Sequence, residues 1–208
     1  MAFQKPRKEF RTVEVVGNNN SPTTYAEPMP DMKGLAPLDL PKQGFQQMNF
    51  QIGEEWEEKL ARLGVQAEDP FDWRLLPFQA GGCDPSRART CGFVRAHSTT
   101  PLALSPAANL ASLALLSDQS LFELSLFVNW ESVPKEWRRL GMTTSLNSRI
   151  SYHVPSARVD EWMVCDSGIS WGANGRVIAD QRFWNYETGE LLLSCTQDAA
   201  VSRQEPML

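Results

Sequence analysis

The sequence of 208 residues lacks several patterns that mark common functional classes. It has only two histidines, His97 and His153, and its four cysteines form no CxxC pair, which argues against a histidine-rich metal site. Basic residues form no long run and the net charge is −5, which disfavours a nucleic-acid surface. No apolar run is long and uninterrupted enough for a membrane span. We therefore expect no metal, no cofactor, no nucleic-acid partner and no membrane span.

The sequence has no signal peptide, and its cysteines are Cys83, Cys91, Cys165 and Cys195. This combination indicates reduced thiols in an intracellular protein. Free cysteines usually behave as small buried hydrophobic side chains, and we interpret these four in that way.

Charge is also absent from residues 98–117. Ser105 is suited to cap the N-terminus of a helix, and Pro106 fits the first helical position. Ala, Leu and Ser then occupy every side of the helical wheel until Asp118. A helix that is apolar all round is a buried helix, so the sequence predicts a central helix over about 105–121.

The segments around this helix predict a sheet. Residues 1–47 are rich in proline and resemble a linker that could lie along the domain surface through Met29, Met32, Leu35 and Leu38. Residues 48–208 form the predicted domain, with a short amphipathic helix at 53–64 and a polar surface excursion at 130–139. Six runs have the period of strands: 71–78, 90–98, 143–152, 161–170, 176–185 and 191–200. The last two are joined by a hairpin containing Gly189. The order indicates an α+β protein, an antiparallel sheet wrapped around one helix, which is the hotdog fold.

Several motifs resemble one known family, and the similarity covers roughly residues 70–202. Their order and spacing resemble the C-terminal hotdog of the acyl-CoA thioesterase II (TesB-like) family. The motifs are FDWRLLPF at 71–78, GFVRAHS at 92–98, LLSD at 115–118, TTSLNSRISYH at 143–153, DEWMV at 160–164, SWGANGR at 170–176, NYETGELL at 185–192 and SCTQDAAV at 194–201. Members carry two hotdogs in one chain, and MAFQKP and EPMPD are similar to the end of the first hotdog and the linker. The resemblance therefore implies a half-length member.

The family resemblance also implies a catalytic trio of an Asp, a Ser or Thr, and a Gln that orients a water toward a thioester carbonyl. Carried over by position, the Gln falls on Gln197 and the hydroxyl on Ser170, with Ser167 as the reserve. The Asp falls on Asn147, because SLN stands where the family has SLD. The residues alone also single out Gln197, since it shares an otherwise apolar face of its strand, where a buried amide is either a structural tie or a site residue.

Asn147 changes the chemistry that the family route would need. Alternation places it on a polar strand face with Ser145, Arg149 and Ser151. A carboxamide cannot take a proton from an attacking water as a carboxylate can. A substitute base would then have to be chosen from four other groups: Asp118, Asp166, Asp198 and His153.

Three functions remain open at this point. The resemblance implies an acyl-CoA hydrolase, whose activity Asn147 could weaken. The alternative is a diverged hotdog that binds a small apolar molecule and catalyses cyclisation, dehydration or isomerisation in a natural-product pathway. A third is a non-catalytic partner of a full-length thioesterase. A single hotdog leaves an open sheet edge, so we expect a homodimer or pairing with another hotdog. The C-terminus shows no SKL-like signal, so the expected location is the cytoplasm, and the family resemblance leaves the peroxisome as the alternative.

Overall fold

The computed structural model describes residues 28–42, 70–77, 79, 89–97, 105–119 and 140–203. In this part of the chain a short 3-10 helix, η1 (Pro37–Asp39), precedes one α-helix, α3 (Pro106–Gln119). The strands are β1 (Phe71–Leu75), β2 (Arg89–Ala96), β3 (Leu140–Tyr152), β4 (Met163–Ala173), β5 (Arg176–Asn185) and β6 (Leu191–Arg203). The predicted helix at 53–64 and the excursion at 130–139 lie outside the described residues.

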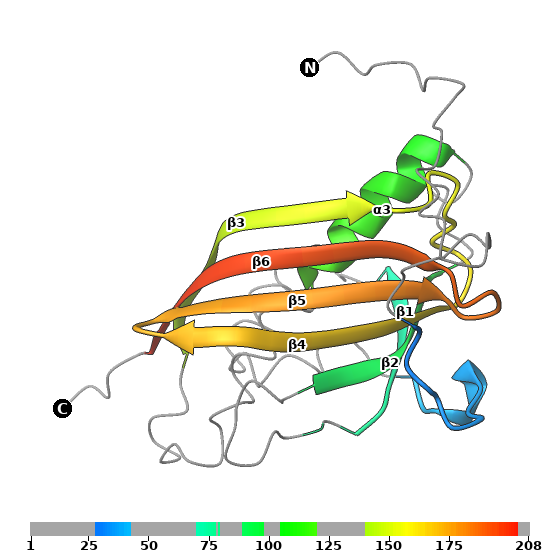
Figure 1. Ribbon diagram of the computed structural model, residues 1–208, viewed down its shortest axis with the longest axis horizontal. Coiled ribbons are helices and arrows are strands. Elements are labelled where there is room, and N and C mark those ends of the chain that lie inside the picture. The colour runs from blue at the N-terminus through cyan, green and yellow to red at the C-terminus, as the bar shows by residue number, and fades with distance from the viewer. Residues whose placement is uncertain are drawn as a thin grey trace, which may run out of the picture.

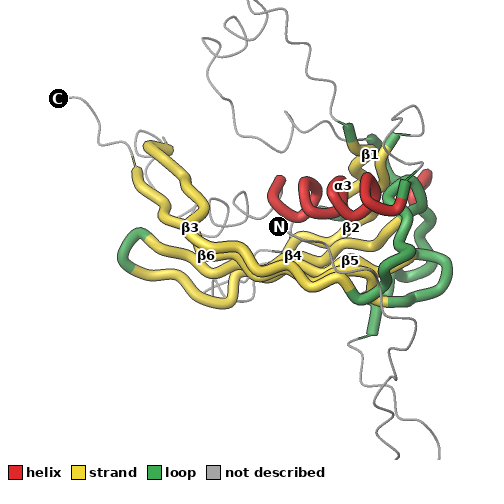
Figure 2. The backbone as a smooth tube through the Cα atoms, turned by 90° about the horizontal axis from the view of Figure 1, so that it is seen from above, coloured by secondary structure: helices red, strands yellow, loops and turns green. Residues whose placement is uncertain are grey.

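The six strands form one antiparallel sheet in the order β1-β2-β4-β5-β6-β3. The ribbon in Figure 1 shows the long strands β3 to β6 side by side. Seen from above, α3 runs over one face of this sheet, and the edge strand β1 rises beside it (Figure 2). We call this the helix face and the opposite one the outer face. The predicted α+β hotdog fold is confirmed.

Helix α3 begins as the sequence predicts. Ser105 Oγ accepts a hydrogen bond from the Ala108 amide at 3.1 Å, and Pro106 occupies the first turn, where no amide donor is needed. The prediction that the helix is buried all round is wrong. Leu113 and Leu116 are fully buried, but Leu115 is 50% exposed. The helix lies on the sheet rather than inside a closed wrap, so its far side faces outward.

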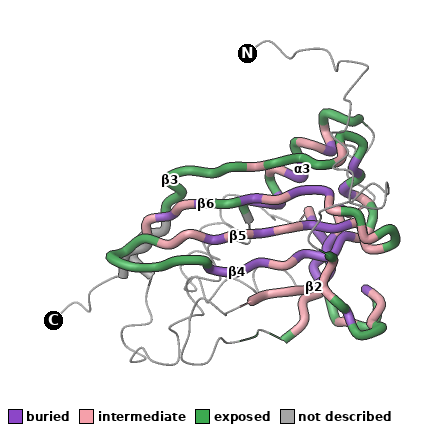
Figure 3. Tube along the Cα trace, in the orientation of Figure 1, coloured by how far each residue is buried: buried purple, intermediate pink, exposed green. Residues whose placement is uncertain are grey.

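The main core lies between α3 and the helix face. It consists of inward-facing side chains from α3, from the strands and from the loop that precedes β4. Its members are Phe71, Trp73, Val94, Ala96, Leu113, Leu116, Ala157, Val159, Met163, Cys165, Ala179, Phe183, Leu192, Leu193 and Cys195. Burial is concentrated in the middle of the sheet, whereas the described side chains of β3 are largely exposed (Figure 3).

A second, smaller core covers the outer face. Residues 28–42, which we call the strap, place Met32 against Phe93 of β2 and Val164 of β4. Met29 and Leu35 pack against the same cluster, as their sequence predicts, whereas Leu38 is 71% exposed. The strap therefore acts as the second layer over this part of the sheet.

An ionic cluster holds the end of the strap. Asp72 of β1 is 5% exposed, and its carboxylate accepts from Arg74 Nε at 2.8 Å. Arg95 of β2 lies 4.0 Å from the same carboxylate. Arg74 also donates to the Leu40 carbonyl at 2.7 Å, which joins the strap to β1. The Asp72 charge is thus paired, as a buried carboxylate requires.

Both described hairpins turn where the sequence allows positive φ. Gly189 has φ 70° between β5 and β6, as predicted. Asn174 and Gly175, with φ 51° and 72°, form the tighter turn between β4 and β5. In the part of the chain that the structure describes, no helix is long and apolar enough to cross a membrane.

Asn109 joins α3 to the loop that precedes β4. Its substitution therefore tests how much this contact contributes to the stability of the fold. Its Oδ1 accepts from the Val159 amide at 3.0 Å, and its Nδ2 donates to the Ser105 carbonyl at 3.1 Å. Asn109→Ala leaves the buried Val159 amide without this acceptor. We expect the free energy of unfolding to fall by about 1–3 kcal/mol in urea titrations.

The exposed Asn147 supplies the matched control for this change. Asn147→Ala should alter the free energy of unfolding by less than about 0.5 kcal/mol. Equal losses in the two variants would contradict the anchoring role of Asn109.

Candidate active site

Gln197 lies on β6 and is 1% exposed. The period of the strand turns it to the helix face together with Leu193 and Cys195, as the sequence predicts. Its amide nitrogen donates to Asp118 Oδ1 at 2.7 Å and to Ser145 Oγ at 2.8 Å. Since a carboxylate can only accept, the contact with Asp118 fixes which end of the amide is the NH2 group.

Ser145 reaches this amide because β3 contains a bulge. Ser145 is in register with Ala199, but Asn147 is in register with Asp198, so Leu146 is an extra residue on β3. Without the bulge, Ser145 and Asn147 would lie on one strand face. With it, Ser145 shares the face of Ala199 and Gln197, whereas Asn147 shares the outer face with Asp198. The predicted grouping of Ser145 with Asn147 is therefore wrong.

Asp118 comes from the C-terminal part of α3. It is one residue beyond the buried Ser117, and its own side chain is exposed. Leu116, two residues earlier on the same helix, packs into the main core and sets the rotation of the helix about its axis. The trio of Asp118, Ser145 and Gln197 thus unites a helix, an edge strand and an inner strand across 79 and 52 residues of sequence.

The trio has donors and acceptors left over. Gln197 uses both amide hydrogens, yet its buried Oε1 has no partner in the described part of the chain. Ser145 Oγ accepts from Gln197, so its own proton can be donated elsewhere. The second oxygen of Asp118 can accept from a water. Because Asp118 and Ser145 are exposed, a substrate can approach these two groups from outside.

Two of the predicted site residues lie apart from the Gln197 amide. Asn147 is exposed and lines an outer-face hollow of about 600 Å³ with Arg149, Thr196 and Asp198. Ser170 is exposed, and its Oγ donates to the Ile178 carbonyl at 3.3 Å. Their catalytic roles stay predictions that no contact with Gln197 supports.

The reserve serine and the other candidate bases have different surroundings. Ser167 is 2% exposed and in register with Gln181, within the sheet. Asp166 faces outward and lies 3.4 Å from Arg89. His153 Nε2 lies 2.9 Å from Ser194 Oγ. Of the four bases that the sequence offers, Asp118 is the one that contacts Gln197.

The described cysteines are poor nucleophiles. Burial raises the pKa of Cys195, which lies beside the trio, and the charge of Asp118 adds to this effect. Burial likewise raises the pKa of Cys165 and takes that of Cys91 to about 11, with Asp166 contributing in both cases. Since the thiolate is the reactive form, these groups stay protonated and inert at neutral pH. Chemistry at the site therefore depends on oxygen and nitrogen groups.

A comparison with known protein families identifies the family of this chain. A family model of the acyl-CoA thioesterase C-terminal domain matches residues 37–201. The chain belongs to this acyl-CoA thioesterase family. A search of curated proteins found no match.

Solved structures agree on the fold of this thioesterase-family chain. It is similar to acyl-CoA thioesterase II TesB2 from Mycobacterium marinum, with a TM-score of 0.61 and 18% identity over 89% of this chain and 59% of that one. The tesB protein of Mycobacterium avium subs paratuberculosis gives 0.59 and 19%, over 86% and 56%. A hot dog protein from Alicyclobacillus acidocaldarius gives 0.57 and 16%, over 89% and 58%. The chain spans less than two thirds of the length of each.

The sequence carries a signal for each of the two partners of Gln197. Asp118 ends the LLSD motif that supports the resemblance, and it is one of the four substitute bases that the sequence offers. Ser145 is the first residue of the SLN motif. Strand alternation could not single it out, because the bulge at Leu146 is visible only in the register with β6.

Cys91 gives a prediction for the pH dependence of stability. Its folded pKa of about 11 lies above the ordinary value of 9.0. As the pH rises from 9 to 11, the unfolded chain releases this proton before the folded one does, so the folded state loses stability. After allowance for the partly exposed thiol, the loss is about 1–2 kcal/mol.

Urea titrations at several pH values between 9 and 11 measure this loss. In Cys91→Ala the free energy of unfolding should fall less steeply with pH than in the wild type. Parallel slopes in the two proteins would show that Cys91 carries no such linkage.

Proposed function

We propose that the protein hydrolyses acyl-thioesters, with CoA as the expected carrier, at Asp118, Ser145 and Gln197. The observation that carries the proposal is the buried amide of Gln197, which donates to both a carboxylate and a hydroxyl. These are the three residue types that the family resemblance leads one to expect. Membership of the thioesterase family supports the reaction class.

The contacts allow a water to attack the thioester carbonyl. Gln197 holds one oxygen of Asp118, which leaves the other to accept a proton from the water. The Ser145 hydroxyl, fixed as an acceptor by Gln197, turns its proton toward the water or the carbonyl oxygen. Water oxygen bonds to the carbonyl carbon, the C–S bond breaks, and the proton on Asp118 passes to the leaving thiolate. The products are a carboxylic acid and a free thiol.

This assignment replaces Asn147 and Ser170 in the proposed mechanism. The case for cyclisation, dehydration or isomerisation rests in part on the loss of a carboxylate at Asn147. Asp118 supplies a carboxylate in contact with Gln197, so that loss no longer argues against hydrolysis.

Single substitutions distinguish the two sets of residues. Asp118→Asn should lower kcat for acyl-CoA hydrolysis by about 10²–10⁴-fold, because the base is lost. Ser145→Ala and Gln197→Ala should also lower kcat, while Asn147→Ala and Ser170→Ala should retain activity close to wild type. Free thiol released from acyl-CoAs of several chain lengths is the readout.

Asn147→Asp adds a further comparison. With Asp118 as the base, a second carboxylate on the outer face should give no gain in rate. A rise of about tenfold or more would instead support Asn147 as the position of the base. Release of no thiol by the wild type would refute hydrolysis itself.

We also propose that the protein forms a homodimer through β3. This strand is 13 residues long and lies at an edge of the described sheet. Its described residues 144–149 are all exposed, and Leu146 is 49% exposed. A long open edge invites pairing with another strand, and a second copy would supply one.

Light scattering should give a particle of about twice 23.4 kDa at micromolar concentration. Leu146→Asp should shift it toward the monomer, because the charge would be placed against the partner edge. Leu38→Asp, on the exposed strap, is the matched control and should leave the mass unchanged. A wild-type monomer would contradict the proposal.

A further inference from the structure

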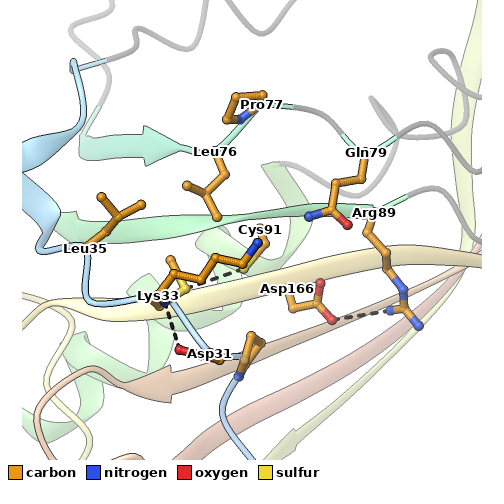
Figure 4. A pocket seen from close by; sticks show the side chains of 11 residues that line it. Asp31, Lys33, Leu35, Leu76, Pro77, Gln79, Arg89, Cys91 and Asp166 are labelled. Atoms are coloured by element: carbon orange, nitrogen blue, oxygen red, sulfur yellow. Dashed lines mark hydrogen bonds and ion pairs between the residues drawn. The ribbon is translucent and has the colours of Figure 1, made fainter.

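The outer face carries a cavity of about 510 Å³ that the trio does not use. It lies between the strap and the β1–β2 side of the sheet, and Figure 4 shows its lining from close by. We call it the strap pocket. Cavities of ~300–1,000 Å³ are the size that holds small molecules. It is separate from the trio, since Gln197 faces the helix side of the same sheet.

The inner part of the strap pocket is apolar. Met32 is 6% exposed, and Leu35, Leu76 and the half-buried Cys91 pack in the same outer core. Met32 Sδ lies 3.8 Å from Cys91 Sγ, so the two sulfurs share the pocket lining. Such a surface suits a hydrocarbon chain, because it offers no charge and no strong acceptor to be left unpaired.

The opening of the strap pocket gathers polar side chains. Lys33, Gln79 and Asp166 extend toward one space in Figure 4, with Arg89 beside them. Asp166 is already paired with Arg89 at 3.4 Å, and Asp31 Oδ1 accepts from the Lys33 backbone amide at 2.8 Å. The Lys33 ammonium has no hydrogen-bond partner in the described residues, nor does the Gln79 side chain. The Lys33 ammonium and the Gln79 NH2 group therefore offer donors at the opening, beside the Gln79 carbonyl oxygen and the second oxygen of Asp31.

Lys33 is held in an unusual backbone conformation. Its φ is 54° and that of Gly34 is 76°, and the Leu35 amide donates to the Met32 carbonyl at 3.0 Å. A lysine pays strain in this left-handed region, and such strain is often found at functional sites. The turn carries Lys33 over the pocket while Met32 and Leu35 remain in the core.

We propose that the strap pocket binds a monocarboxylic acid with an apolar chain. The carboxylate meets Lys33 and Gln79, and the chain lies against Met32, Leu35 and Leu76. Asp31, at the same opening, favours an amine instead, which makes charge the decisive test. The inference goes beyond the proposed hydrolysis and does not require it. If hydrolysis does occur, its acid product belongs to this chemical class.

Protection of Cys91 from alkylation tests the site directly. Octanoate is added to the full chain with N-ethylmaleimide at about pH 8.5, where octylamine keeps its charge, and the peptide containing Cys91 is followed by mass spectrometry. We expect octanoate to slow the labelling of Cys91 in a saturable manner. Octylamine, with the same chain and the opposite charge, should not protect.

Variants locate the carboxylate. Lys33→Gln should weaken octanoate protection about tenfold, which is the scale of a lost charge-assisted hydrogen bond. Lys42→Gln, a cation of the same strap outside the pocket, is the matched control and should bind as the wild type does. Asp118→Asn should also retain protection, because the trio lies on the other face.

Three outcomes would overturn the proposal. These are absence of protection at octanoate concentrations below micelle formation, better protection by octylamine, and unchanged protection in Lys33→Gln. Loss of protection in Asp118→Asn would instead assign the binding to the trio. None of these readouts depends on hydrolysis, so a protein without thioesterase activity can still pass or fail them.

Discussion

The sheet has two apolar faces in its β2–β4 region, and both must be removed from water. Phe93 and Val94 alternate across β2, Val164 and Cys165 alternate across β4, and all four are buried. One helix can cover only one face of a sheet. Helix α3 covers Val94 and Cys165, and the strap covers Phe93 and Val164. A segment with the composition of a linker is therefore part of the folded domain, and Arg74 fixes its end to β1.

The candidate site lies at the other edge of the sheet, where the described residues of β3 are largely exposed. Strand β3 pairs with β6 alone in the described part of the chain, and the single extra residue at Leu146 reverses which side chains face α3. Ser145 is turned toward Gln197 by this bulge, and Asn147 is turned away from it. Bulges often redirect a side chain next to an active site at a sheet edge. The same local irregularity thus sets the geometry of the candidate site.

The architecture could be predicted because it follows from local patterns. Strand alternation, the Ser105–Pro106 helix start and the Gly189 turn each depend on residues close in sequence, and the structure confirms all three. Gln197 was predictable for the same reason, since an amide on an apolar strand face requires a partner. Its partners were not, because Asp118 and Ser145 reach it only through the rotation of α3 and the register of β3. The sequence does not reveal the exposed side of α3, because apolar residues occupy both its buried and its exposed positions.

A glutamine at position 197 performs a task that its acidic counterpart could not. Two hydrogens on one nitrogen let it donate to Asp118 and Ser145 together, whereas a glutamate would place a second negative charge 2.7 Å from the first. Burial strengthens these bonds, because water cannot compete for the amide. Its Oε1 has no partner among the described residues, and a buried acceptor left without a donor costs roughly 1–3 kcal/mol. The free Oε1 therefore offsets part of what the two donated hydrogen bonds contribute to the stability of β6.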